Sequence, residues 1–203
     1  MGVLVQCNYG NDQQLRIAGI PVAREMKYQL YCVEKQLNPP TLDWYTGKAA
    51  PVCDPKQVVR ADGARREQGS IIVIVATDAP LMPDQLKRLA RRVSLGLGRA
   101  GSIEGDDSGD IFLAFSTANT GADNGNSMEG TNYVLPFKNA TVQRVVSWQM
   151  DPIFDAVTQS TEEAIDNALI AAKTMTGANY WVSPALPQDQ LKEILRKHNM
   201  LKQ

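Results

Sequence analysis

An unbroken apolar run lies in the first half of the chain, directly after a charged and turn-rich passage. It reads Ser70-Ile71-Ile72-Val73-Ile74-Val75-Ala76-Thr77 and follows Gln68-Gly69. β-Branched residues bounded by turn residues predict a strand, and the lack of alternation predicts that both of its faces are buried. Ser70 therefore stands at the polar border of a rigid element, after a glycine that permits a strained backbone and a close approach.

Four further segments carry an extended pattern and are expected to be strands: 2–8, 15–22, 111–117 and 141–148. The first leads into a turn at Asn8-Tyr9-Gly10-Asn11-Asp12. Because a chain that opens with a core strand leaves little room for an element that protects a sheet edge, we expect upstream sequence to be absent.

Helical spacing follows Pro83, with apolar residues at Leu86, Leu89, Ala90, Val93 and Leu97. This pattern predicts an amphipathic helix packed on a sheet, whose lysines and arginines form a solvated face. A long helix is expected from Asp151-Pro152 to Gly177, unless a capping box of Ser160 and Glu163 divides it in two. Residues 187–197 predict a short terminal helix.

The segment Gly96-Leu97-Gly98-Arg99-Ala100-Gly101 matches the glycine pattern of dinucleotide-binding folds. In those folds the pattern follows a strand and opens a helix, so that backbone amides face a pyrophosphate. Here it closes a predicted helix, so we interpret these glycines as a helix stop. A nucleotide-binding module built on this cluster is kept as an alternative that a saturable thermal shift with nucleotide would support.

Residues 36–68 contain four prolines and end in a charged cluster, and they are interpreted as one long loop. A loop of this length is uncommon inside a compact domain and is usually functional or disordered. It is either a solvated insertion or a processing loop. The second interpretation goes with the hypothesis that the protein cuts its own Gly69-Ser70 bond and leaves Ser70 as an amino-terminal nucleophile, because the ends of the loop would then separate. We expect 1–203 to be a single domain or the C-terminal part of one, with 1–69 upstream of the cleavage site and 70–203 carrying the nucleophile.

The overall composition is that of an ordinary globular protein, with 43% hydrophobic residues and a net charge of -1. This charge argues against nucleic acid as a partner, and no apolar run is long enough to span a bilayer. The first residues lack the basic head and long apolar core of a signal peptide, so we expect a cytoplasmic chain.

Cysteine and histidine usage restricts the chemistry further. Cys7, Cys32 and Cys53 show no C-x-x-C spacing, so neither a disulfide framework nor a zinc site is predicted, and no cofactor is expected. The sequence holds one histidine, His198, five residues from the end. A Ser-His-Asp triad would have to rest on this tail, so hydrolytic chemistry here needs a base other than imidazole.

A polar turn at 105–110 leads into the strand predicted over 111–117. Because side chains alternate along a strand, Ser108 and Asp110 can point to one face if the extended geometry begins by Ser108. A hydroxyl and a carboxylate would then lie together at the start of a strand. A calcium-binding loop is the alternative, but the turn lacks the ligand spacing and distal glutamate of an EF-hand.

Three segments together resemble a known family: Gly69 to Leu81, Gln85 to Arg92, and Ser108 to Asn119. They look like the self-processing aminopeptidases that include the D-aminopeptidases (L-aminopeptidase/D-esterases) and the β-peptidyl aminopeptidases. The resemblance runs from Val3 to the helix around Thr161 and covers about the second half of the family's precursor. It implies an α/β fold, an α-β-β-α sandwich like that of amino-terminal-nucleophile hydrolases, incomplete here at its N-terminal side.

The resemblance also implies site residues. Ser70 would be the nucleophile, Ser108 and Asp110 its supporting pair, and Asn8 an oxyanion donor. The precursor would cut its own Gly69-Ser70 bond, and the freed amine, which titrates near pH 8, would replace imidazole as the base. Asp110 is an aspartate where the β-peptidyl members carry glutamate, so its reach is one methylene shorter.

The expected function is therefore that of an aminopeptidase and amidase-esterase acting on short peptides, amino-acid amides or esters, in a homo-oligomer that needs an upstream subunit or segment. The opposing hypothesis is a non-catalytic fragment or scaffold, because a missing upstream half would expose a sheet edge and remove part of the pocket. An intact 203-residue chain without hydrolysis would favour the scaffold.

Overall fold

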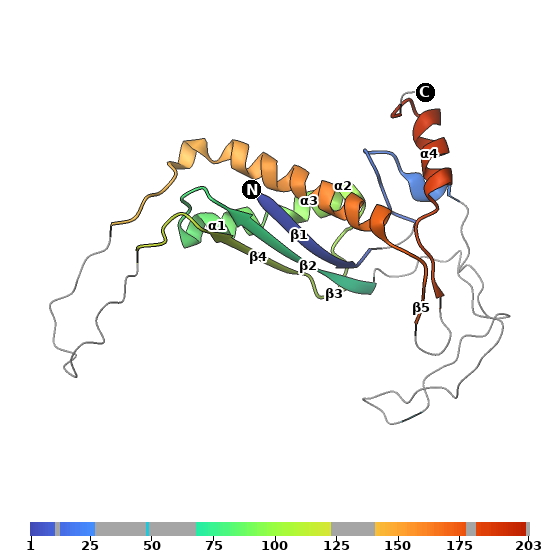
Figure 1. The fold of residues 1–203 in the computed structure, drawn as a ribbon, viewed down its shortest axis with the longest axis horizontal. Helices are drawn as coiled ribbons and strands as arrows, with labels where there is room; N and C mark the ends of the chain where they lie inside the picture. Colours follow the sequence, from blue (N-terminus) through green and yellow to red (C-terminus); the bar gives the residue numbers. More distant parts are fainter. Residues whose placement is uncertain (11–12, 27–47, 49–67, 123–140, 178–181, 202–203) are drawn as a thin grey trace.

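The computed structural model describes residues 1–10, 13–26, 48, 68–122, 141–177 and 182–201. Figure 1 shows strands and helices gathered in the centre, with α4 set apart at the C-terminal end. In chain order the elements are β1 (Gly2–Asn8), the 3₁₀ turn η1 (Val22–Arg24), β2 (Gln68–Thr77), α1 (Pro83–Ala90), α2 (Val93–Ala100), β3 (Asp107–Ser108), β4 (Ile111–Ser116), the 3₁₀ turn η2 (Ser147–Gln149), α3 (Asp151–Ala171), β5 (Met175–Thr176), β6 (Val182–Ser183) and α4 (Gln188–Lys197).

The predicted apolar strand, β2, is the centre of the main sheet. β1 runs antiparallel to it on one side and places Asn8 opposite Ser70. β4 runs parallel to it on the other side. The short β3 pairs with the start of β2, where Gly69 lies opposite Ser108. The sheet thereby brings the three expected site segments to one end of β2.

Helices cover one face of this sheet. α3 packs against β1 and α2, and α1 packs against β4 (Figure 1). Every second residue of β2 enters the core, which also takes apolar residues from all three helices. Its fully or almost fully buried members include Ile71, Val73, Val75, Leu89, Val93, Leu97, Val157 and Ile165.

The opposite face of the sheet corrects one expectation from the sequence. β2 was predicted to be buried on both faces and 111–117 to be a second buried strand, yet both alternate. Large apolar side chains on this face are 42 to 68% exposed: Leu4, Ile72, Ile111, Leu113 and Phe115. Besides the two-stranded sheet of β5 and β6, the described residues supply one helical layer and one four-stranded sheet, whereas an α-β-β-α sandwich would place another sheet on this face. We call this face the open face.

Two predicted strands are also wrong. In 15–22 the structure has only a bridge in which the backbones of Ile17 and Ile20 exchange two hydrogen bonds. In 141–148 the Val145 N–H donates to the Pro80 carbonyl, and the Val145 carbonyl accepts from Gln85 Nε2 of α1. Both segments carry apolar residues, but neither pairs with a strand among the residues that the structure describes.

The helices differ from their predictions at the ends. The helix expected after Pro83 is two helices, α1 and α2, separated at residues 91–92. α3 is continuous through Ser160 and ends at Ala171, before the predicted Gly177. Its N-cap is Met150, so Asp151 begins the helix and does not cap it. α4 matches the predicted terminal helix within one residue.

The glycine cluster lies in α2 and at its end, as the sequence predicted for a helix stop. A Cβ added at Gly96 would lie 2.8 Å from the Thr158 carbonyl oxygen, so α2 and α3 can pack closely only because this residue is glycine. Gly101 caps α2 in the left-handed region at φ 106°. Gly101 closes the helix and Gly96 packs it against α3, so two of the three glycines have a structural role that needs no nucleotide.

A second, smaller core joins α4 to the segment around η1. Val22, Met26, Leu191 and Ile194 are buried in it. At its edge the Glu25 carboxylate accepts a hydrogen bond from Lys197 Nζ at 2.6 Å and lies 2.6 Å from His198 Nε2. These hydrogen bonds from Lys197 and His198 lower the pKa of Glu25. The one histidine of the sequence therefore pairs with Glu25 in this smaller core.

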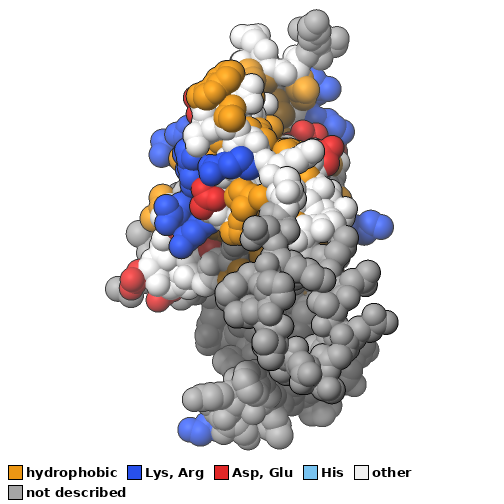
Figure 2. Space-filling view, turned by 90° about the vertical axis from the view of Figure 1, so that its left-hand side faces the viewer, with side chains coloured by type: hydrophobic (Ala, Val, Ile, Leu, Met, Phe, Trp, Pro, Cys, Tyr) orange, Lys and Arg blue, Asp and Glu red, His pale blue; other side chains and the backbone are white. Residues whose placement is uncertain are grey.

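The surface that faces the viewer in Figure 2 is of mixed charge. In Figure 2 basic and acidic side chains lie interspersed among apolar ones on its described part, in keeping with the net charge of -1. Among the described residues, no helix is long and apolar enough to cross a membrane.

A carboxyl group on α3 makes the stability of the fold depend on pH. Burial first, and then the Glu162 and Glu163 carboxylates, raise the pKa of Asp166 from 3.8 to about 6. The unfolded chain ionises this group near pH 4, so the stability that its raised pKa contributes is complete below that pH. It is lost as the pH rises through about 6.

We therefore expect Asp166→Asn to stabilise the protein by about 1 kcal/mol at pH 7.5, allowing for screening of a half-exposed group, and to have no effect at pH 4. Denaturant unfolding of both proteins at several pH values between 4 and 7.5 measures this difference. An effect of the same size at every pH would contradict the assignment.

Candidate active site

Ser70 lies at the start of β2 with its side chain on the open face. Side chains alternate along a strand, and Ile71 is fully buried beneath the helices, so Ser70 and Ile72 point the other way. Asn8, the register partner of Ser70 on β1, shares that face. The hydroxyl and the Asn8 side chain are thus neighbours across the two strands, as the sequence-based assignment requires.

The backbone of Gly109 holds the Ser70 hydroxyl. Its N–H donates to Ser70 Oγ at 3.0 Å. A Cβ added at Gly109 would lie 3.0 Å from the same oxygen, so this residue admits the hydroxyl closely because it has no side chain. Sequence reasoning did not single out Gly109. Its position between the two polar candidates, Ser108 and Asp110, was the available signal.

The structure brings Ser108 and Asp110 together. Ser108 Oγ donates to Asp110 Oδ1 at 2.8 Å, and the same oxygen accepts the Ile71 N–H at 2.9 Å. The carboxylate therefore ties the turn before β4 to the residue that follows Ser70. Its other oxygen, Oδ2, is buried and has no hydrogen-bond partner among the described residues.

The bond between Gly69 and Ser70 lies in an unusual backbone conformation. Gly69 has φ +119°, which L side chains rarely adopt, and an added Cβ would lie 1.9 Å from the Asn8 carbonyl oxygen. Only glycine fits here without a shift of the backbone. The backbone of β1 at Asn8 thus lies close to Gly69, the residue whose carbonyl is expected to be attacked.

The direction of the Ser70 nitrogen follows from strand geometry. Successive backbone N–H groups of a strand point to opposite edges, and the Ile71 N–H points to Asp110, on the β4 side. The Ser70 nitrogen therefore points towards β1 and Asn8. An amine freed at this position would lie across β2 from Asp110, with the Ser70 hydroxyl on the face between them.

Cys7, on the strand next to Ser70, is a second candidate nucleophile among the described residues. Burial raises the pKa of the Cys7 thiol to about 11, so at neutral pH it stays protonated and is a weak nucleophile. Cys32 and Cys53 lie outside the described residues. Within the described ranges no three His, Cys, Asp or Glu residues are grouped to hold a metal ion.

Comparisons with known proteins identify the family and the fold of the chain. The model of peptidase family S58 matches residues 1–182. The chain belongs to this family. It is 40% identical over 203 residues to the β-peptidyl aminopeptidase BapA of Sphingosinicella microcystinivorans and 37% identical over 201 residues to that of Sphingosinicella xenopeptidilytica. These matches cover 99% and 97% of this S58 chain, but 44% and 42% of the two relatives.

Solved structures of S58-like enzymes share the fold. The L-aminopeptidase D-Ala-esterase/amidase of Ochrobactrum anthropi, described as a variant of the Ntn hydrolase fold, superposes with a TM-score of 0.71 at 36% identity. A Burkholderia sp. β-aminopeptidase superposes with a TM-score of 0.64 at 32% identity. They match 98% and 96% of this chain, and 44% and 43% of their own. The S58 chain therefore has the expected α/β fold and spans less than half the length of its relatives.

Proposed function

We propose that this chain is the nucleophile-bearing part of a serine aminopeptidase that activates itself by cutting the Gly69-Ser70 bond. Its substrates would be short peptides, amino-acid amides or esters with a free amino end. The observation that carries the proposal is the meeting of Ser70, Gly109, Ser108 and Asp110 at the start of β2 in a member of family S58.

Self-cleavage would begin with attack of Ser70 Oγ on the Gly69 carbonyl carbon. The C–N bond to Ser70 then breaks, its nitrogen takes up the proton that the Ser70 hydroxyl gives up, and an ester joins Gly69 to Ser70 Oγ. Water hydrolyses this ester, which leaves a carboxylate at Gly69 and restores the Ser70 hydroxyl beside a free amine. The close approach of the Asn8 backbone to Gly69 supports this route, because it restricts the backbone of the residue whose carbonyl would be attacked.

Turnover would use the new amine as the base. An α-amine with an ordinary pKa near 8 is partly neutral at working pH and can accept the hydroxyl proton as Oγ attacks a substrate carbonyl. The Gly109 N–H donates to the nucleophile, and the Ser108–Asp110 pair is tied to the next residue through the Ile71 N–H. The Asn8 side-chain amide would donate to the oxyanion, a type of contact worth about 3 to 4 kcal/mol in other hydrolases.

The open face suggests that this chain acts together with further polypeptide. The Ser70 hydroxyl lies at the end of a sheet face whose large apolar side chains are exposed, so a substrate bound there would have one wall. We refer to the part of the relatives' chains that has no counterpart in these 203 residues as the complementary half. We expect it to cover the open face and to complete the substrate pocket.

A non-catalytic scaffold remains the second candidate, and the exposure of the open face favours it. The enzyme and scaffold proposals predict different hydrolysis rates when the chain is co-expressed with the complementary half, and Asp110→Asn tests the role of the carboxylate in the enzyme. The asparagine oxygen can still accept the Ser108 and Ile71 hydrogen bonds, so the fold should survive while the lost charge slows acyl transfer by about 100-fold. Hydrolysis of L-, D- and β-amino-acid p-nitroanilides measures the effect.

The matched control is Asp107→Asn, which changes a neighbouring exposed carboxylate. It should keep wild-type rates. Unchanged kinetics in Asp110→Asn would remove Asp110 from the site. A complete lack of hydrolysis in the wild-type assembly, with every substrate, would favour the scaffold.

A further inference from the structure

Two arginines near the end of α1 stack on one aromatic ring of α3. The Arg88 guanidinium carbon lies 5.0 Å from the centre of the Phe154 ring, and that of Arg92 lies 4.0 Å from it. Phe154 itself is buried, with 8% of its surface exposed. Stacking on a ring holds the plane of a guanidinium group and leaves its N–H edge able to donate to a ligand.

The two positive charges lie close together without a carboxylate to neutralise them. Within the part of the chain that the structure describes, neither Arg88 nor Arg92 forms an ion pair. Arg92 Nη1 donates instead to the Arg88 carbonyl at 3.3 Å. The sequence from 85 to 103 contains no Asp or Glu. Because like charges at short range repel each other, an anion bound to both arginines would be stabilising.

A groove runs beside the stacked arginines, where α2 packs against α3. It has a volume of about 520 Å³, which lies in the range of small-ligand sites. Leu95, which is 57% exposed, and Gly98 line it from α2, and Phe154 lines it from α3. Arg92 and Arg99 belong to its charged lining. We call it the arginine groove.

The partners of its charged residues indicate where an anion would bind. Arg99 is already paired with Glu162 Oε2 at 3.3 Å. Asp155, the carboxylate of the lining, accepts a hydrogen bond from Gln159 Nε2 at 2.8 Å and forms no ion pair with Arg92. Of the two lining arginines, Arg92 is therefore the one whose charge is available to a ligand.

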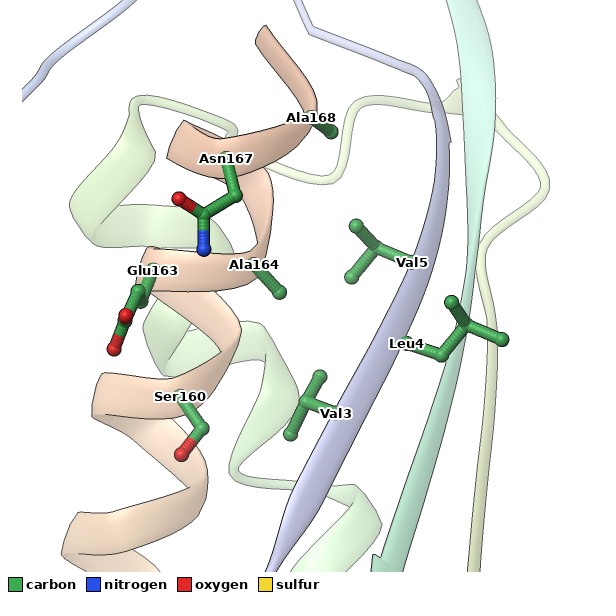
Figure 3. A pocket seen from close by; sticks show the side chains of 8 residues that line it. All are labelled: Val3, Leu4, Val5, Ser160, Glu163, Ala164, Asn167 and Ala168. Atoms are coloured by element: carbon green, nitrogen blue, oxygen red, sulfur yellow. The ribbon is translucent and has the colours of Figure 1, made fainter. Parts of the chain in front are cut away.

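Figure 3 shows a second groove, between β1 and α3, which has the opposite character. Its volume is about 480 Å³, and Val3 and Val5 point into it towards Ala164. Its one charged lining residue is Glu163. An anion would meet a carboxylate and no cation there, so this groove is an internal reference for binding at the arginine groove.

We propose that the arginine groove binds a small organic anion. Its phosphate or carboxylate oxygens are held by Arg92 and the neighbouring Arg88, and its flat apolar part lies along Leu95 and Gly98. A guanidinium group can donate two parallel N–H groups to such an oxyanion. The groove lies among the helices, whereas the Ser70 hydroxyl lies on the open face of the sheet. The ligand is therefore distinct from the peptide substrate, and the inference does not rest on the proposed function.

Titration of the isotope-labelled full chain with phenyl phosphate, benzoate and benzylamine at constant ionic strength tests this proposal. The two anions should shift the backbone amide signals of Arg92, Leu95 and Thr158 saturably, with a Kd of about 1 mM or below. Signals of Ser160 and Asn167, in the groove of Figure 3, should stay unchanged. The relative affinity of the two anions distinguishes phosphate from carboxylate. Benzylamine carries a similar ring with a positive charge and should not bind.

Two variants should change the affinity for the tighter anion in opposite directions. Arg92→Gln should weaken binding at least about tenfold, and Asp155→Asn, which removes the carboxylate of the lining, should strengthen it about threefold. A loss of folding could not strengthen binding, so the second variant separates charge from structure. Arg196→Gln removes the same charge from the exposed surface of α4 and should bind as the parent chain does.

Three results would each overturn the proposal. The first is the absence of saturable shifts with both anions. The second is binding of benzylamine at the same residues, which would show that the ring alone is recognised. The third is unchanged affinity in Arg92→Gln and Asp155→Asn alike.

Discussion

Ser70→Ala is expected to leave the chain uncut and to lower amide hydrolysis by about 10⁴-fold or more, the scale seen when a serine hydrolase loses its nucleophile. The substitution removes the attacking oxygen from both self-cleavage and turnover. Folding should be little affected, because the lost hydrogen bond from the Gly109 N–H lies at an exposed position. Gel electrophoresis reports cutting, and p-nitroanilide hydrolysis reports turnover.

The control for this variant is Ser116→Ala on β4. Ser116 Oγ donates to the Ala79 carbonyl and accepts the Ala118 N–H, so its role is to hold a turn. Ser116→Ala should lower the free energy of unfolding by about 1 kcal/mol and leave self-cleavage intact. Normal processing in the Ser70→Ala chain would remove Ser70 from the mechanism.

Gly69→Ala is expected to slow self-cleavage by about 100-fold, the effect of misplacing a reacting group by about 1 Å. The new Cβ would lie 1.9 Å from the Asn8 carbonyl oxygen, and the φ of +119° is unfavourable for alanine. The backbone must move, and the attacked carbonyl moves with it. The fraction of cut chain against time after synthesis measures the rate.

Gly101→Ala provides a matched control. It has the same kind of clash, 1.9 Å from the Gln14 carbonyl oxygen at φ +106°, but at the end of α2. It should destabilise the protein by about 1 to 3 kcal/mol without slowing cutting in the folded fraction. Equal cutting rates for the Gly69→Ala, Gly101→Ala and wild-type chains would show that the Gly69 backbone does not position the scissile carbonyl.

The sequence predicted the elements that carry local signals. β1 and β2 follow from their apolar and β-branched composition, and α4 from its spacing. The meeting of Ser108 and Asp110 followed from side-chain alternation, which depends only on where the extended backbone begins.

Other features depend on contacts that no local pattern contains. An apolar run does not say what covers it, so the exposure of Ile72 and Leu113 was not foreseen. Residues 141–148 were predicted to be a strand, but the Val145 backbone groups bond to the Pro80 carbonyl and to the Gln85 side chain. The hydrogen bond from Gly109 to Ser70 Oγ comes from a backbone N–H. Every residue except proline has this group, so residue type alone could not identify Gly109 as the donor.

The central claim is that Ser70 becomes an amino terminus by cutting the bond before it. Intact mass spectrometry of a preparation that hydrolyses amino-acid amides tests this most directly. The account predicts two polypeptides, residues 1–69 and 70–203, the second with a free amine at Ser70. An active preparation in which the chain is continuous through Gly69 and Ser70 would contradict it.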